Sequence, residues 1–456
     1  MTKRLSMRVG VVLLAVAAVI LWRHTPTGDA AQARDRSGAY NPYADNNGDQ
    51  LPPGYSGPRY RLNYNYPTRP PVTPADPPWR KALQGKPMGK DNAVAYVQAL
   101  KQFIAGDVKT LVDDYQKWDP FAAGWYDQPW IAQKIQYDLP GTTKTGNWPG
   151  REPIQGAYPG PQFTKTIYPD LKVPLMQDYV VVYYNDVAGY TFHRLWQNPN
   201  PYQPNPRQAQ FNEGAIAIKL ALTTVSGKDW APLEGSVQSN VLVPLPAANP
   251  APSTEPPRIV PVYAMQLDII VKDSKTAPKT GWVYSTLVYD KGAPGATTWD
   301  KLVPLGAMWG NDPGVDNEDL RETVINPAAP AYARITLGWG RRLSGPNDAA
   351  TQSLHPPKDP TRISSCMSCH GSAEYPAEAA LVPAGPKGFF APGSPQWDQW
   401  FQDRSGRIPQ TPGGVALDYA MVSRQALINW DAARGGDAAL ARATRHLQLL
   451  RQRGTY

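Results

Sequence analysis

The fold of this chain is decided by the stretch Met265-Gln266-Leu267-Asp268-Ile269-Ile270-Val271, followed by Trp282-Val283-Tyr284-Ser285-Thr286-Leu287-Val288-Tyr289. Both segments are rich in β-branched and aromatic residues and follow a period of two, which is typical of strands. Two earlier segments have the same character: Asp178-Tyr179-Val180-Val181-Val182-Tyr183-Tyr184 and Ala215-Ile216-Ala217-Ile218-Lys219-Leu220. Pro and Gly turns separate the segments, and no helical pattern lies between them. The sequence therefore predicts an antiparallel β-rich domain, sandwich-like or barrel-like, with further short strands up to residue 337.

Helical patterns flank the predicted strands. Before them, apolar residues at steps of three and four predict a helix within 91–118: Val94, Val97, Leu100, Phe103 and Ile104. After them, we expect a short turn over 397–402, a helix whose apolar face is formed by residues from Leu417 to Ile428, and a last helix over 438–453. The expected fold class is therefore α+β, in which a β-rich central domain precedes a small, mostly helical segment.

The length of 456 residues exceeds one ordinary core and indicates two or three domains. We expect a leader over 1–33, a Pro/Tyr-rich extended linker over 34–90, a helix followed by the β-rich domain over 91–345, and a helical domain over 346–456. The net charge of +8 is dispersed, and no basic run is interleaved with aromatic residues. Nucleic-acid binding is therefore not expected.

The N-terminus predicts export from the cytoplasm. Basic residues precede an apolar run from Val9 to Trp22, which as a helix would rise about 21 Å against a hydrocarbon core of about 30 Å. This length is typical of a signal-peptide core, and Ala31-Gln32-Ala33 is a small-x-small cleavage pattern. An uncleaved inner-membrane anchor over residues 5–22 remains the alternative. Both interpretations place the rest of the chain in the periplasm, soluble or tethered.

One motif carries the chemistry. Cys366-Met367-Ser368-Cys369-His370 is a C-x-x-C-H sequence that contains both cysteines of the chain. Two residues between the thiols let one turn of backbone present both sulfurs to one face of a porphyrin, where they can form thioethers with its vinyl groups. His370 can then offer an imidazole nitrogen to the iron as the proximal ligand. The motif therefore predicts one covalently attached haem c.

Three other interpretations of the two cysteines are less favoured. A structural zinc site needs four ligands, and only scattered histidines could complete the set. A thioredoxin-like redox pair would open a helix inside a β-α-β unit, whereas Pro356, Pro357 and Pro360 precede this motif. A disulfide across two residues closes too small a loop to stabilise the fold much.

Through Cys366, Cys369 and His370 the chain resembles the c-type cytochromes. The resemblance implies one covalent haem c, iron held by His370, attachment outside the cytoplasm and a cytochrome c-like haem segment. It covers little beyond the motif and does not extend to the first 345 or so residues. The loop predicted over 344–365 differs from the helix that usually runs into this motif in small soluble cytochromes c.

The sixth iron ligand remains open between four possibilities. Met421 lies 51 residues after His370 on a predicted helix, and a thioether ligand would raise the reduction potential. His355 on the preceding loop would give a bis-histidine haem, and Met308 would reach over from the β-rich domain. The fourth possibility is an open or water-bound iron. His193 and His446 are interpreted as structural or surface residues. We expect six aromatic side chains to shield the porphyrin: Phe389, Phe390, Trp397, Trp400, Phe401 and Trp430.

These observations favour an exported electron-transfer cytochrome that exchanges electrons with a periplasmic redox partner protein. The alternative is a haem-dependent periplasmic oxidoreductase, peroxidase- or oxygenase-like, in which the β-rich domain forms a pocket for a small-molecule substrate. In a third interpretation the haem mainly stabilises the fold or senses a ligand. The carrier needs a six-coordinate iron, whereas the enzyme needs an open distal side.

Overall fold

The computed structural model describes residues 60–129, 157–197, 203–243, 258–335, 337–344, 363–385 and 388–434. The leader expected over 1–33, most of the loop expected over 344–365, His355, His446 and the helix expected over 438–453 lie outside these residues. None of the helices in the described ranges is long and apolar enough to cross a membrane.

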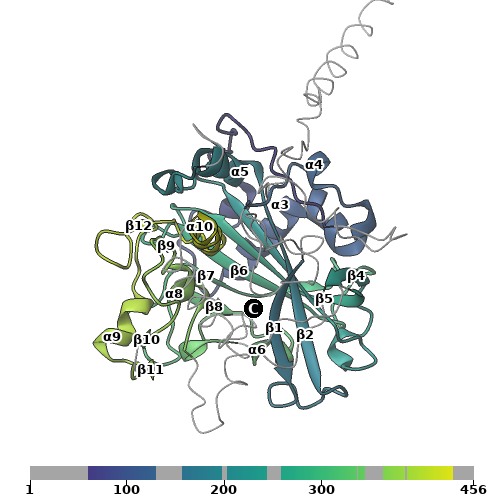
Figure 1. Cartoon of the computed structure of the whole chain (residues 1–456). Coiled ribbons are helices and arrows are strands. Elements are labelled where there is room, and N and C mark those ends of the chain that lie inside the picture. Colours follow the sequence, from purple (N-terminus) through teal and green to yellow (C-terminus); the bar gives the residue numbers. More distant parts are fainter. Residues whose placement is uncertain are drawn as a thin grey trace, which may run out of the picture.

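The described strands form one large curled sheet (Figure 1). Its eight strands are β1 (Ala157–Thr164), β2 (Leu175–Tyr184), β3 (Ile216–Thr223), β4 (Gln238–Val243), β5 (Arg258–Lys272), β6 (Trp282–Tyr289), β7 (Leu302–Met308) and β8 (Thr323–Ile325). Their order is β1-β2-β3-β5-β6-β7-β8, with β4 also paired to β5, and all these pairs are antiparallel. The four strand segments predicted from the sequence are β2, β3, β5 and β6.

The antiparallel, β-rich α+β class is confirmed, but the arrangement differs from the expected sandwich. The long strands belong to one sheet, and helices and loops cover its faces where a second large sheet would lie. Outside it, the described residues form two small ladders, β9 (Glu374–Tyr375) with β12 (Val415–Ala416) and β10 (Ala384–Gly385) with β11 (Gly388–Phe389). Near residue 335 the structure has the short helix α6 (Ala331–Arg334) instead of a strand.

One face of the sheet is covered by α3 (Ala93–Asp113), which matches the helix predicted within 91–118. This helix packs against β5 and β7, with the short helices α2 (Pro78–Lys81) and α4 (Pro120–Ala123) beside it. Every second residue of the central strands is buried on this face, including Val181, Leu220, Ile269, Val283 and Leu287. Because side chains alternate between the two faces of a strand, the intervening residues point to the opposite side.

The opposite face meets the C-terminal segment. There α8 (Cys366–His370), α9 (Pro395–Asp398) and α10 (Met421–Arg434) gather at the left of Figure 1. Residues from both parts share one apolar cluster, for example Leu305 and Met308 from the sheet and Met367 and Leu427 from the C-terminal segment. The C-terminal segment and the sheet therefore share a core on this face.

The helix α10 begins later than the sequence pattern predicted. Leu417 and Ala420 precede it, because Asp418 and Tyr419 adopt positive φ angles of 48° and 67° that cannot continue into a right-handed helix. The turn expected over 397–402 is present as α9 followed by a 3₁₀ turn.

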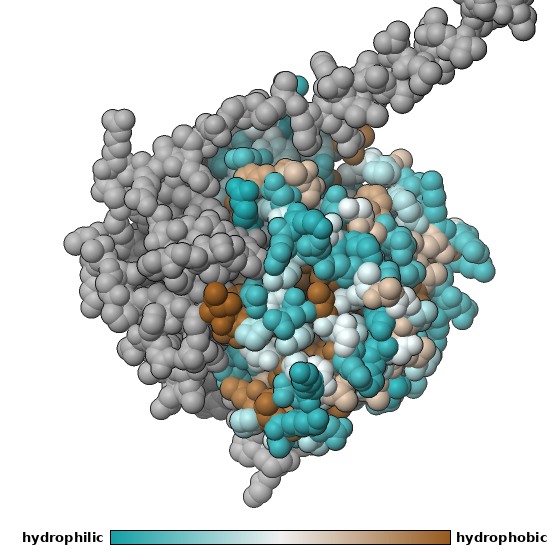
Figure 2. Space-filling view, turned by 90° about the vertical axis from the view of Figure 1, so that its right-hand side faces the viewer, coloured by the Kyte–Doolittle hydropathy of each residue, from teal (hydrophilic) through white to brown (hydrophobic). Residues whose placement is uncertain are grey.

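The described end of the expected linker is packed into the molecule. Tyr60, Leu62, Tyr64 and Tyr66 are all buried. The outer surface seen in Figure 2 is mostly hydrophilic where it is coloured, with small separate hydrophobic areas. Such scattered apolar residues are ordinary for a protein surface, so they indicate no particular docking face.

Candidate functional site

The C-x-x-C-H motif forms the single-turn helix α8, and side chains fix its start. Ser365 is the N-cap: its hydroxyl accepts from the Ser368 backbone N–H at 2.9 Å, and the Ser368 hydroxyl accepts from the Ser365 N–H at 2.7 Å. The backbone N–H of Cys366 donates to the Leu343 carbonyl at 2.8 Å. The motif is therefore held in place by its own N-cap and by the hydrogen bond to the preceding segment.

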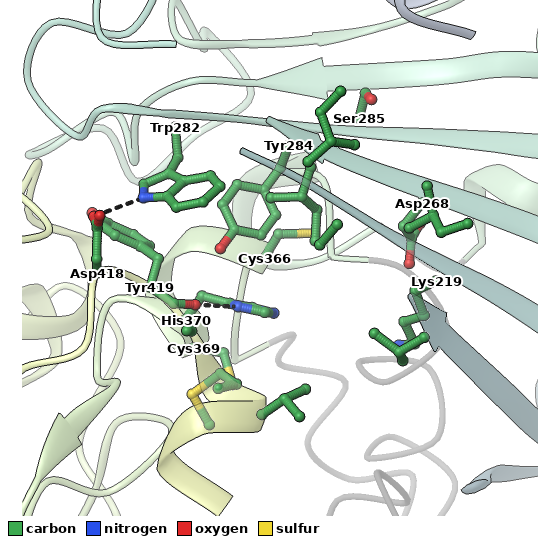
Figure 3. Close-up of a pocket in the computed structure, with 18 of the residues that line it drawn as sticks. Lys219, Asp268, Trp282, Tyr284, Ser285, Cys366, Cys369, His370, Asp418 and Tyr419 are labelled. Atoms are coloured by element: carbon green, nitrogen blue, oxygen red, sulfur yellow. Dashed lines mark hydrogen bonds between the residues drawn. The ribbon is translucent and has the colours of Figure 1, made fainter. Parts of the chain in front are cut away.

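Both cysteines and His370 line a cavity between the sheet and the C-terminal segment (Figure 3). The cavity has a volume of about 150 Å³, smaller than the roughly 300–1,000 Å³ typical of ligand and cofactor pockets, and it is partly open to solvent. Its wall is mostly apolar. From the sheet come Val182, Tyr184, Ala217, Lys219, Asp268, Ile270, Trp282, Tyr284 and Thr286, and from the C-terminal segment come Asp418, Tyr419, Ala420, Met421 and Val422.

The two cysteines form no disulfide and are half-buried. Burial raises the pKa of the Cys366 thiol far above its ordinary value, so the thiolate that zinc binding or thioredoxin-like attack would need is disfavoured. Among the described residues, no three His, Cys, Asp or Glu side chains converge as metal ligands, and the described strand pairs offer no β-α-β unit. The side chains of the motif do not converge on one point, as the ligands of a zinc ion would. Attachment of a porphyrin through two thioethers and one iron ligand does not require such convergence.

His370 is oriented by the backbone. Its Nδ1 lies 2.8 Å from the carbonyl oxygen of Tyr419. Because a carbonyl can only accept, Nδ1 carries the proton and Nε2 has a free lone pair. Burial lowers the pKa of His370 to about 4, which keeps the ring neutral, and the ring of Tyr284 packs edge-on at 4.9 Å between centroids. Metal-ligating histidines almost always donate their other nitrogen to a carbonyl or carboxylate in this way.

The Tyr419 carbonyl is itself held by the preceding residue. Asp418 is buried and accepts hydrogen bonds from Lys272 Nζ at 2.6 Å, Trp282 Nε1 at 2.8 Å and the Phe211 N–H at 2.9 Å. Lys272 and Trp282 belong to β5 and β6. The turn that orients His370 is therefore fastened to the sheet on the far side of the cavity.

The other residues singled out by the sequence are divided between the cavity and its surroundings. Met421 lines the cavity, whereas Met308 is fully buried in the apolar cluster beside it and is not part of the lining. His193 lies 3.4 Å from Gln197 Oε1, consistent with its interpretation as a structural residue.

The six aromatic residues that were expected to shield the porphyrin lie away from the cavity. Trp397, Trp400 and Phe401 form a separate cluster with Phe390 against it, Phe389 is exposed, and Trp430 packs at the edge of the apolar cluster. None of the six lines the cavity. Trp397, Trp400, Phe401 and Phe390 pack together because α9 and its 3₁₀ turn fold back on the loop after α8. Aromatic shielding comes instead from the sheet, through Trp282 and Tyr284.

Sequence reasoning missed Lys219 and Asp268, which face the cavity from β3 and β5. A signal was present, since each interrupts an otherwise apolar strand. A charged side chain inside such a strand is costly unless it faces a polar or open site. The alternation of side chains along a strand places these two residues on one face. Which face of the sheet borders a cavity is known only once the helix that covers the other face has been located.

No protein-family model, curated protein or solved structure matches this chain. The site is therefore interpreted from its own chemistry. Two thiols outside any disulfide, a neutral imidazole with an available Nε2 and a largely apolar cavity wall are together a donor set that fits covalent attachment of haem c.

Proposed function

We propose that this chain is an exported mono-haem c-type cytochrome that transfers electrons through a haem attached to Cys366 and Cys369 and ligated by His370. The observation that carries the proposal is the hydrogen bond from His370 Nδ1 to the Tyr419 carbonyl, 2.8 Å long. It leaves Nε2 as the ring nitrogen available to iron, in a cavity that both thiols share. When bound, the haem supplies one-electron redox chemistry.

Each residue of the chain has a separate task in this proposal. Cys366 and Cys369 anchor the porphyrin edge from one helical turn. His370 binds the iron, and the Tyr419 carbonyl fixes its tautomer and ring plane. Trp282 and Tyr284 exclude water on the sheet side, which lowers the local dielectric and so tunes the reduction potential.

Met421 fits packing better than ligation. Its backbone N–H donates to the same Tyr419 carbonyl, at 3.1 Å, so α10 begins on the Nδ1 side of the imidazole. If His370 holds the iron through Nε2, Met421 would pack beside the imidazole and would not ligate the iron.

A second candidate function has an observation in its favour. Lys219, Asp268 and Thr286 put polar groups into a cavity that an electron carrier would keep apolar. The polarity and donors of a distal pocket decide whether haem iron activates a ligand or only passes electrons. The second candidate is therefore a periplasmic haem oxidoreductase with a small-molecule substrate.

An optical spectrum of the purified protein, oxidised and dithionite-reduced, tests both candidates. The haem c proposal requires a sharp α-band in the reduced form, and a preparation made with active haem-attachment machinery that lacks this band would refute it. Carbon monoxide separates the two functions. A reduced spectrum that carbon monoxide leaves unchanged supports the carrier, whereas ready binding supports the oxidoreductase.

A further inference from the structure

A row of side chains crosses the sheet on the cavity side. In the register of the strands, Val182 of β2 lies opposite Lys219 of β3, Lys219 opposite Asp268 of β5, and Asp268 opposite Thr286 of β6. All four line the cavity. Adjacent residues in such a row share one face of a sheet, so three polar groups stand side by side in a wall that is otherwise mostly apolar.

The two charged members of the row are bonded very differently. Asp268 Oδ1 accepts hydrogen bonds from Gln266 Nε2 at 2.7 Å and from Thr286 Oγ1 at 2.8 Å. Lys219 makes no hydrogen bond or ion pair with another residue in the described part of the chain. Although Asp268 lies opposite Lys219 in the strand register, the two form no ion pair, so the Lys219 ammonium is left facing the cavity.

Lys219 and Asp268 line the same cavity as the motif residues. Figure 3 shows the His370 ring between Tyr419 on one side and the part of the cavity that holds Lys219 and Asp268 on the other. Because Nδ1 is bonded to Tyr419, the free Nε2 is the nitrogen nearer to these two residues.

We infer that Lys219 and Asp268 form the polar wall facing the sixth coordination position, and that Lys219 recognises a small monovalent inorganic anion there. The inference rests on the proposed haem and on the second candidate function, in which the sixth position of the iron is open to a ligand. An ammonium in a largely apolar cavity attracts an anion more strongly than it would in water, since little solvent screens the charge. The small volume of the cavity, about 150 Å³, favours a compact ligand.

The test is a spectroscopic titration of the ferric holoprotein with sodium azide. The key variant is Lys219→Met, which keeps the length of the side chain and removes its charge. We expect the dissociation constant for azide to rise about tenfold or more in Lys219→Met, because one nearby charge at low dielectric is worth at least ~1.4 kcal/mol. Lys219→Arg should retain most of the affinity. Carbon monoxide, which is neutral, should bind the ferrous forms of the wild type and both variants alike.

Lys228→Met is the matched control, because Lys228 is exposed and does not line the cavity, so its loss changes only the net charge. Equal azide affinity in wild type and Lys219→Met would overturn the inference. So would a wild-type haem spectrum that azide leaves unchanged, since a protein ligand would then occupy the sixth position. Both results differ from failure of the proposed function itself, in which no covalent haem would be present in a pyridine haemochrome assay.

Discussion

Two lysines, one on each side of the sheet, differ in their hydrogen bonding. On the closed face, Lys101 of α3 donates to the carbonyls of Trp299 at 2.6 Å and Leu302 at 2.8 Å, so its ammonium is fully used in structure. On the cavity face, Lys219 is half-buried without a described bonding partner. A fold satisfies a buried charge for stability and leaves one open only where something else meets it. The contrast favours the cavity face as the side that carries the proposed site.

The difference is created within single strands. Ile269 and Ile270 are neighbours on β5, yet Ile269 is fully buried beneath α3 whereas Ile270 lines the cavity. The same alternation separates Val283 from Tyr284 on β6. One sheet therefore provides a rigid packed core on one side and positions the candidate haem site on the other.

Replacing both cysteines should have the largest effect of the changes proposed here, and the effect should be confined to the cavity face. We expect Cys366→Ser combined with Cys369→Ser to abolish covalent haem, because a hydroxyl does not form the thioether. Acid-acetone extraction of the denatured protein measures it: haem should stay with the wild-type chain and leave the double variant.

The closed face supplies the control for this variant. Far-UV circular dichroism should keep its β-sheet signal, since neither cysteine belongs to the core beneath α3. Covalent haem retained in the double variant would refute the attachment site. Two alkylatable cysteines in the denatured wild-type holoprotein would contradict it independently.

Truncation of the neighbouring isoleucines should separate the faces by stability. We expect Ile269→Ala to lower the free energy of unfolding by about 2–5 kcal/mol, because it leaves a cavity in a closed core. Ile270→Ala should cost clearly less, since its side chain already borders open space. Urea denaturation of both variants in the same cofactor state measures this, and equal losses would show that the two faces are packed alike.

Much of this arrangement was predictable from the sequence. The period of two in β2, β3, β5 and β6 and the period of α3 depend on local burial, so they were identified correctly. The number of sheets was not, because whether strands close into a sandwich depends on what covers the second face. Lys219 and Asp268 were missed as site residues for the same reason. The turn at Asp418 and Tyr419, which orients His370, needs bonds to β5 and β6 that no local pattern contains.

Two buried carboxyl groups should respond to pH with opposite signs. Burial raises the pKa of Asp273, but hydrogen bonds from Arg80, Thr276 and Tyr96 outweigh it, so the pKa is lowered overall. On the cavity side of β2, burial raises the pKa of Asp178 to about 8. Asp273 therefore stabilises the fold above its unfolded pKa of about 4 and loses this contribution as the pH falls. Asp178 favours the protonated native state, so its contribution is present below about pH 4 and is lost as the pH rises toward 8.

Asparagine substitutions test these signs at pH 7. We expect Asp273→Asn to destabilise the protein by about 2–4 kcal/mol, because it breaks the buried pair with Arg80. Asp178→Asn should instead stabilise it by about 1 kcal/mol or more and flatten the loss of stability between pH 4 and pH 8. Unfolding curves recorded across this range measure both effects, and a stabilising Asp273→Asn or an unchanged pH profile in Asp178→Asn would contradict the assignment.

Met421→Ala is expected to change the haem spectrum and the reduction potential the least. A small change would indicate that Met421 does not ligate the iron. Met421 and His370 share the Tyr419 carbonyl, so the methionine would pack beside the imidazole and would not hold the iron. If this is the arrangement, the variant should keep the α-band and spin state of the wild type. Its reduction potential should move by less than ~59 mV, the shift that corresponds to tenfold in a one-electron equilibrium. A larger drop with a change to high spin would make Met421 the sixth ligand and would return the cavity face to the role of a closed electron-transfer site.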